Sequence, residues 1–131
     1  MSTYLLDTSV IIDYFRGKPD AVKLLDTTDG EFFSSYICLA EIYEGIHRGS
    51  NKEKMAYAAN IFFSSLSGMY GVDQGIAKKF GEIRANLKKK GNVIEDLDLL
   101  LAATCLVHGL TLMTYNKKHF SRIKDLSIYP V

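Results

Sequence analysis

Short apolar runs alternate along the chain with longer segments in which apolar positions recur every three or four residues. The short runs predict buried strands at Tyr4–Leu6, Glu31–Ser34, Met69–Val72 and Leu110–Thr114, with a further strand at Ile128–Tyr129. The longer segments predict helices at about 8–15, 19–25, 36–48, 52–66, 74–90 and 97–108. Strands that alternate with helices are typical of an α/β domain with a mostly parallel sheet.

Polar residues and glycines mark the expected helix boundaries. Thr8 or Ser9 is expected to cap the first helix, Asp73 the long helix that follows the third strand, and Gly109 ends the last one. The helix at 97–108 is apolar on every face, which predicts that it is buried.

The length of 131 residues predicts a single domain, residues 1–131, and 47% hydrophobic with 24% charged residues excludes a disordered or fibrous protein. No apolar run reaches the roughly 18 residues of a membrane span, and no signal peptide is evident at the N-terminus. Cys38 and Cys105 do not have the spacing of a metal site, which favours a reducing cytoplasm as the location. The net charge of +1 combines an acidic first half with a more basic second half.

Four polar side chains occupy positions where a ligand site is expected. Asp7 directly follows the first strand and Asn116 follows the fourth, and ligands of parallel sheets bind beyond the carboxyl ends of the strands. Asp98 lies in the first turn of the apolar helix, and Glu41 lies inside the helix at 36–48. Each residue also has a simpler interpretation: Asp7 as a helix cap, Asp98 as a partner of the helix dipole, Glu41 as a surface acid and Asn116 as a turn former.

Taken together, these carboxylates would repel one another strongly if they converged in a dry pocket. A hard divalent cation such as Mg²⁺ or Mn²⁺ resolves that repulsion. A metal-bound water can attack a phosphodiester, and a second metal can stabilise the leaving oxygen. The hypothesis is therefore a metal-dependent hydrolase that cuts phosphodiester bonds.

Four segments resemble the motifs of PIN-domain ribonucleases, and within them the VapC toxins of bacterial and archaeal toxin–antitoxin pairs. Their order and spacing match over essentially the whole chain. The four segments are Leu5–Ile12 (LLDTSVII), Leu39–Gly45 (LAEIYEG), Ile94–Thr104 (IEDLDLLLAAT) and Leu112–Ile123 (LMTYNKKHFSRI).

The resemblance implies a three-layer α/β/α fold with four or five strands and a Mg²⁺- or Mn²⁺-dependent endoribonuclease. Asp7, Glu41 and Asp98 match the core acids, and Asn116 falls at the fourth position, which is Asp in many members. Other residues are expected to assist the core acids: Asp96 as an auxiliary acid or further metal ligand, Ser9 or Thr8 as a hydroxyl near the metal, and Thr114 as a residue that orients a metal ligand.

The resemblance also implies an RNA substrate, an antitoxin whose tail lies across helices near the site, and a homodimer; no membrane association is expected. Two basic runs are candidate RNA contacts, at Lys117, Lys118 and Arg122 and at Lys88, Lys89 and Lys90. Four aromatic residues exceed what one small core needs and are candidates for a partner surface: Tyr14, Phe15, Phe62 and Phe63.

Two other functions remain open from the sequence. One is a PIN fold that binds RNA or protein without cutting, to which the Asn116 substitution lends support. The other is a phospho-receiver signalling domain, which would need two adjacent acids after the first strand where this chain has Asp7 alone. Nucleophilic catalysis by Cys105 with His108 has little support, because Cys105 lies among apolar residues.

Overall fold

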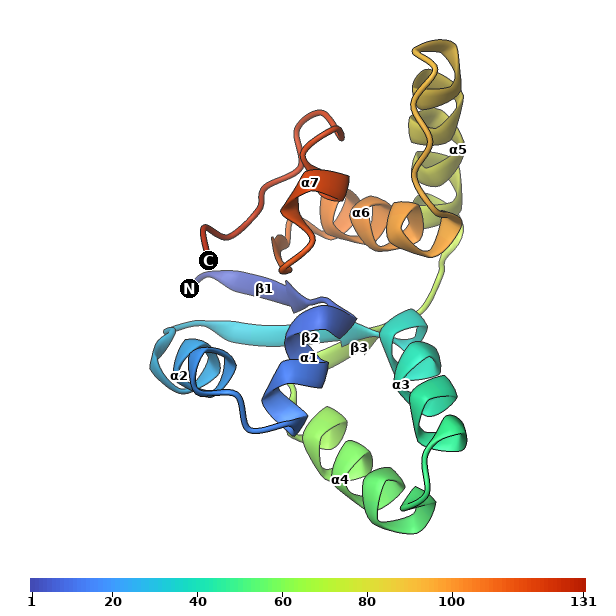
Figure 1. Cartoon of the computed structure of the whole chain (residues 1–131). Helices are drawn as coiled ribbons and strands as arrows, with labels where there is room; N and C mark the ends of the chain where they lie inside the picture. Colours follow the sequence, from blue (N-terminus) through green and yellow to red (C-terminus); the bar gives the residue numbers. More distant parts are fainter.

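A sheet of four parallel strands lies at the centre of the fold, described here from a computed structural model of residues 1–131 (Figure 1). The strands are β1 (Thr3–Leu6), β2 (Glu31–Ser35), β3 (Gly68–Tyr70) and β4 (Thr111–Met113). They lie in the order β3-β2-β1-β4, and every pair is parallel. The predicted α/β class is therefore confirmed.

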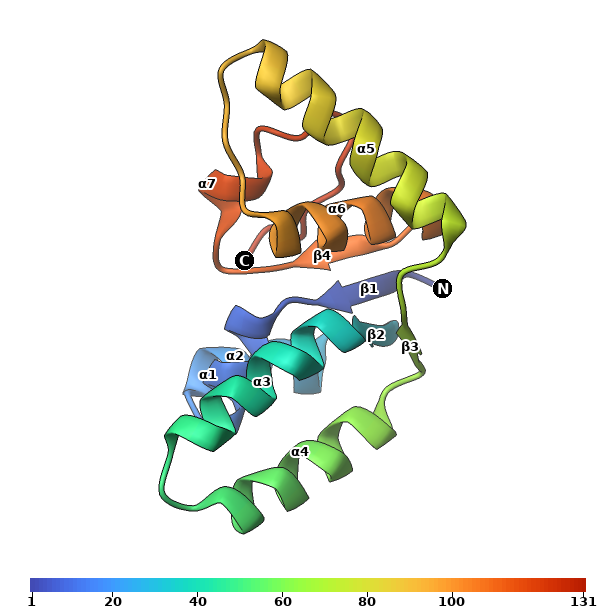
Figure 2. The same cartoon turned by 90° about the vertical axis from the view of Figure 1, so that its right-hand side faces the viewer.

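Seven helices complete a three-layer α/β/α arrangement. They are α1 (Thr8–Phe15), α2 (Pro19–Thr27), α3 (Tyr36–Arg48), α4 (Lys52–Ser65), α5 (Gln74–Lys89), α6 (Asp96–His108) and α7 (Lys117–Phe120). Helices α1 to α4 lie on one side of the sheet, and α5, α6 and α7 lie on the other (Figure 2). None of these helices is long and apolar enough to cross a membrane.

Some sequence-based boundaries are wrong. The predicted strand at Ile128–Tyr129 is reduced to one parallel bridge between Leu112 and Ile128. This C-terminal segment still covers the outer edge of β4, because the Leu112 N–H donates to the Ser127 carbonyl and the Tyr129 N–H donates to the Leu112 carbonyl. The short helix α7 was not expected. Asp7, and not Thr8 or Ser9, is the N-cap of α1, because its carboxylate accepts the backbone N–H of Thr8.

Helix α6 is buried over most of its length, as its apolar sequence predicts. Leu99, Leu101 and Ala102 are at most 1% exposed, and α5 packs along the helix. The two ends of α6 differ from the expectation, since Leu97 is 44% and Val107 38% exposed. Burial of this helix fixes the position of its first turn, which carries Asp98.

The aromatic residues suggested as a partner surface pack against one another, and Tyr14, Phe15 and Phe62 remain partly exposed. The Phe62 ring lies 5.3 Å from the rings of both Tyr14 and Phe15, and Phe63 is buried beneath it. This cluster joins α1 to α4 and is part of the packing of the α1–α4 layer.

The order in which strands are added to the sheet reverses between β1 and β4, although all the strands are parallel. The chain first builds β1, β2 and β3 outward in one direction, and then returns to place β4 on the other side of β1. Such a switch point leaves a crevice outside the carboxyl ends of the two strands, which is where parallel sheets bind ligands. Leu6 pairs with Met113, so the next residues along each strand, Asp7 and Thr114, meet at this point.

Candidate active site

Asp7 is held at the switch point by donors from two strand ends. The side chain is 3% exposed, and its Oδ1 accepts the Thr8 N–H at 2.8 Å. Its Oδ2 accepts the hydroxyls of Thr114 at 2.7 Å and Ser9 at 3.1 Å. A buried carboxylate must be compensated by donors or cations, and three donors fix this one in place.

The hydroxyls around Asp7 belong to one network that ties the β4–α7 connection to α1. The Ser9 hydroxyl accepts the Tyr115 N–H at 3.1 Å, and the Thr114 hydroxyl accepts the Asn116 N–H at 2.9 Å. Thr114 is completely buried. The expectation that Thr114 orients a neighbouring acid fits this geometry, since its hydroxyl contacts Asp7 and not open space.

Glu41 reaches the site from α3 and is linked to it through Thr8. The Thr8 hydroxyl donates to Glu41 Oε1 at 2.8 Å. Burial raises the pKa of the Glu41 carboxyl; the Thr8 hydrogen bond lowers it, and the negative charges of Asp7 and Asp98 raise it further. Glu41 thus points inward toward the other acids and is not the surface acid of the simpler interpretation.

Asp98 enters from the first turn of α6, with its side chain 19% exposed. Burial raises the pKa of its carboxyl, the charge of Asp7 raises it further, and His119 on α7 lowers it. His119 Nδ1 lies 3.5 Å from Asp98 Oδ2. Asp7, Glu41 and Asp98 come from three parts of the chain, and they lie near enough to one another that the charge of Asp7 raises the pKa of the other two carboxyls.

The donor chemistry of this site fits a hard divalent cation. Apart from the His119 ring beside Asp98, the groups at this site are carboxylate and hydroxyl oxygens, which Mg²⁺ and Mn²⁺ prefer. No three acidic, histidine or cysteine side chains are arranged as a ready-made metal cage. Mg²⁺ does not need one, because it keeps several waters and is usually bound through one or two carboxylates and a substrate phosphate.

The other predicted site residues lie at varying distances from this centre. Asp96 forms an ion pair with Arg84 of α5 at 2.9 Å and is largely exposed. Arg122 donates to the Val93 carbonyl at 3.1 Å, which ties the C-terminal segment to the α5–α6 loop. The lysines at 88–90 lie at the end of α5, which projects beyond the rest of the domain (Figure 1).

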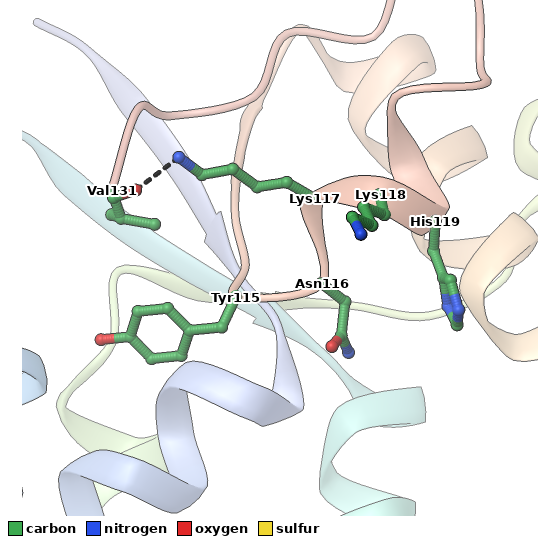
Figure 3. Close-up of a pocket in the computed structure, with 6 residues that line it drawn as sticks. All are labelled: Tyr115, Asn116, Lys117, Lys118, His119 and Val131. Carbon is green, nitrogen blue, oxygen red and sulfur yellow. Dashed lines mark hydrogen bonds between the residues drawn. The ribbon is translucent and has the colours of Figure 1, made fainter.

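A hollow of about 460 Å³ opens beside the acids, at the β4–α7 connection (Figure 3). It is lined by Tyr115, Asn116, Lys117, Lys118, His119 and Val131. His119 joins the hollow to the acids through its contact with Asp98. Neither His119 nor Tyr115 is among the site residues that the sequence predicts. The signal that could have found them is their place in the segment that follows the fourth strand.

Residues 4–126 match the PIN domain family, and the chain belongs to that family. Within it, the chain is 35% identical to Ribonuclease VapC1 of Methanocaldococcus jannaschii, over 97% of this chain and 85% of that protein. The chain thus belongs to the VapC branch of the family.

Solved structures agree with this assignment. VapBC2 from Rickettsia felis, crystallised bound to a promoter DNA fragment, superposes with a TM-score of 0.88 at 28% identity over 97% of both chains. VapBC-1 from nontypeable Haemophilus influenzae gives a TM-score of 0.85 at 28% identity, over 97% of this chain and 96% of that one.

Membership of this family removes the phospho-receiver alternative. Cysteine chemistry is also disfavoured by the structure, because burial raises the pKa of the Cys38 thiol to about 12 and raises that of Cys105 as well. Neither thiol is exposed. Both residues therefore act as packing.

Proposed function

We propose that this protein is a metal-dependent endoribonuclease and the toxin of a toxin–antitoxin pair. The observation that carries the proposal is the link that Thr8 makes between Glu41 and the buried Asp7 at the sheet's switch point, in a chain related to VapC ribonucleases. Asp98 lies near enough for the charge of Asp7 to raise the pKa of its carboxyl. Mg²⁺ or Mn²⁺ bound there would acidify a water and offset the negative charge of the phosphate.

Each side chain has a distinct role in this proposal. Asp7 and Asp98 hold the metal ion, and Glu41 completes the negative site from α3. Thr8, Ser9 and Thr114 keep Glu41 and Asp7 in place through their hydroxyls. These contacts fix the acids before substrate arrives, which is how outer residues support a metal site.

Asn116 is proposed as the fourth site residue, close to the substrate. Its backbone N–H is tied to Thr114, while its side chain lines the hollow with Lys117 and Lys118. The two lysines are proposed to contact RNA phosphates next to the cut. Lys88, Lys89, Lys90 and Arg122 are proposed to contact flanking RNA.

The experiment compares cleavage of labelled RNA by the wild type and by Asp7→Asn and Asp98→Asn, with Mg²⁺ or Mn²⁺ and with EDTA. We expect cleavage only by the wild type with metal. Calorimetric titration with Mn²⁺ gives a second readout, in which both variants bind more weakly. Mapping RNA ends in cells that express wild type or Asp98→Asn then identifies the RNA.

Asp96→Asn is the matched control, because Asp96 lies in the same turn of α6 but pairs with Arg84. We expect this variant to keep most of the cleavage. If it loses cleavage and Mn²⁺ binding as completely as Asp98→Asn does, Asp96 is a metal ligand. If the wild type binds RNA but no metal restores cleavage, the alternative of a binding module that does not cut is correct.

The antitoxin is proposed to bind a groove of about 510 Å³ that runs between α1, α3 and the start of α4. Apolar side chains such as Phe15, Ile46 and Met55 line it, and Glu41 lies at its wall. Such a groove suits an amphipathic segment that ends in a basic side chain, which would pair with Glu41 and obstruct the site. The complexes formed by the VapBC proteins support this proposal.

Gly45→Gln tests the groove. Gly45 lines it, and a Cβ added at this helical position meets no atom within 4 Å, so the position has room for a side chain that starts in the groove. We expect weaker capture of the co-expressed antitoxin and unchanged RNA cleavage. Gly81→Gln on α5, which is equally unobstructed, is the control. Sedimentation of the free chain tests the proposed homodimer.

A further inference from the structure

The hollow beside the acids combines an aromatic ring with positive charge. Tyr115 is 38% exposed, although it directly follows the completely buried Thr114. The lining holds one aromatic ring, two lysines, an asparagine and a histidine, and no Asp or Glu side chain. Lys118 forms no ion pair with a carboxylate, and the Lys117 ammonium donates to the main-chain oxygen of Val131, which holds Lys117 at the rim of the hollow (Figure 3).

The side chains of this segment point in two directions. Figure 3 shows the Tyr115 ring and the Lys117 side chain extending together to one side, while Asn116 and His119 extend to another. His119 contacts Asp98, so the second direction is that of the acids. The backbone N–H of Tyr115 is bound to Ser9, whose hydroxyl also donates to Asp7. The ring is therefore attached to the same network that holds the first acid.

We propose that this hollow is a nucleobase site, in which the Tyr115 ring stacks on an unpaired RNA base next to the bond that is cut. The inference rests on the ribonuclease function proposed above and names a specificity-determining contact for it. Stacking on aromatic rings beside cationic side chains is how proteins hold single-stranded nucleic acid. The volume is in the range of sites that bind small ligands.

The charges around the ring orient the nucleotide. Burial raises the pKa of the Tyr115 hydroxyl, and the negative charges of Asp13 and Asp20 raise it further. These acids repel a phosphate from the hydroxyl end of the ring, whereas a neutral base meets no such repulsion. The phosphate then lies on the lysine side, and the base lies on the ring.

A peptide from a partner protein is the other conceivable occupant, and the surroundings favour RNA. The lining offers little apolar surface besides Tyr115 and Val131, so a hydrophobic peptide anchor has few contacts. The proposed antitoxin groove, by contrast, lies among α1, α3 and α4 and is lined by different residues.

The test measures binding of a short fluorescein-labelled oligoadenylate to the full chain in EDTA, where no cutting occurs. We expect Tyr115→Ala to weaken binding about fivefold or more, and Tyr115→Phe to stay within about twofold of the wild type. Tyr115→Leu keeps the bulk without an aromatic face and is also expected to bind weakly. The Tyr115 side chain makes none of the hydrogen bonds to Ser9, so the network that holds Asp7 stays intact.

An abasic oligomer of the same length separates stacking from phosphate contact. We expect the three variants and the wild type to bind the abasic oligomer equally. The nucleobase site is overturned if Tyr115→Ala loses affinity equally for both oligomers. It is also overturned if the wild type cuts RNA and Tyr115→Ala binds oligoadenylate as tightly as the wild type does. If Tyr115→Ala instead loses antitoxin while RNA binding is unchanged, the hollow is a protein site. A wild type that neither binds nor cuts RNA refutes the ribonuclease function itself.

Discussion

Thr114→Val removes one hydroxyl from the centre of the site without changing the shape of the side chain. The hydroxyl donates to Asp7 Oδ2 at 2.7 Å and accepts the Asn116 N–H at 2.9 Å, in a completely buried position. Hydrogen bonds to charged groups contribute about 1.5–3 kcal/mol, and the Asn116 N–H also loses its acceptor. We expect the free energy of unfolding to fall by about 2–3 kcal/mol.

Urea unfolding followed by far-ultraviolet circular dichroism measures this loss. For a domain of this length, a loss of about 2 kcal/mol lowers the Tm by roughly 8 °C. Thr111→Val is the matched control on the same strand, because its hydroxyl makes only an exposed contact of 3.4 Å with Ser127. Changes at such positions are usually within about 0.5 kcal/mol.

The loss at Thr114 should also reach the metal. Removal of a residue that orients a metal ligand typically lowers metal affinity about 10- to 100-fold, so calorimetry should show weaker Mn²⁺ binding. If Thr114→Val and Thr111→Val unfold at the same urea concentration and bind Mn²⁺ equally, the Thr114 hydroxyl does not hold Asp7 as described.

Three further outcomes are expected. Gly30→Ala should lower the unfolding free energy by more than about 2 kcal/mol in the urea assay, because φ at Gly30 is +146° and the added Cβ would lie 2.7 Å from the Tyr4 ring. Gly17→Ala is the control: its added Cβ meets no atom within 4 Å, so it should lose only about 1 kcal/mol in the same assay. Asp98→Asn should stabilise the metal-free protein at pH 7, because the raised pKa of this carboxyl means that its charged form is disfavoured in the fold. That gain should vanish below about pH 3, where both folded and unfolded chains are protonated, and an equal gain at both pH values would contradict the reasoning. Lys118→Ala should reduce the salt dependence of RNA binding by about 0.7 in log–log slope, and an unchanged slope in a binding titration would remove this residue from the RNA contact.

The strands and most helices could be predicted because their signals are local. Each strand is a short apolar run, and α6 is apolar enough to require burial. Helix α7 (Lys117–Phe120) could not be predicted in this way. It has only four residues and one buried side chain, Phe120, so it shows no repeating apolar pattern. The Ile128–Tyr129 strand was overestimated because its pairing with β4 depends on how far the two segments run side by side.

The positions of Asp7 and Asn116 in the chain predict that both lie at one edge of the sheet, but not which side chains they contact. Asp7 and Asn116 follow strands, and that rule is enough to bring them to one edge of the sheet. The partners of these residues come from remote segments, such as Ser9 with Tyr115. A competing partner is equally invisible in the sequence: Asp96 is engaged by Arg84, which is a consequence of the packing of α5 on α6.

The contacts of the aromatic residues could not be predicted by counting them. Phe15 and Phe62 appear surplus when residues are counted against one small core, which favoured a partner surface. In the structure Phe62 packs against Tyr14 and Phe15 and so joins α4 to α1, while Phe15 also lines the groove between α1, α3 and α4. Counting apolar residues does not reveal how many packed layers must be filled.

The position of β4 beside β1 has a consequence for synthesis in the cell. Asp7 and the Thr114 hydroxyl that binds it are 107 residues apart in the chain. At about 5–20 residues per second, the ribosome makes the second roughly 5–20 s after the first. During that interval the nascent polypeptide carries Asp7 without its partner. The centre therefore cannot form until most of the chain has been translated.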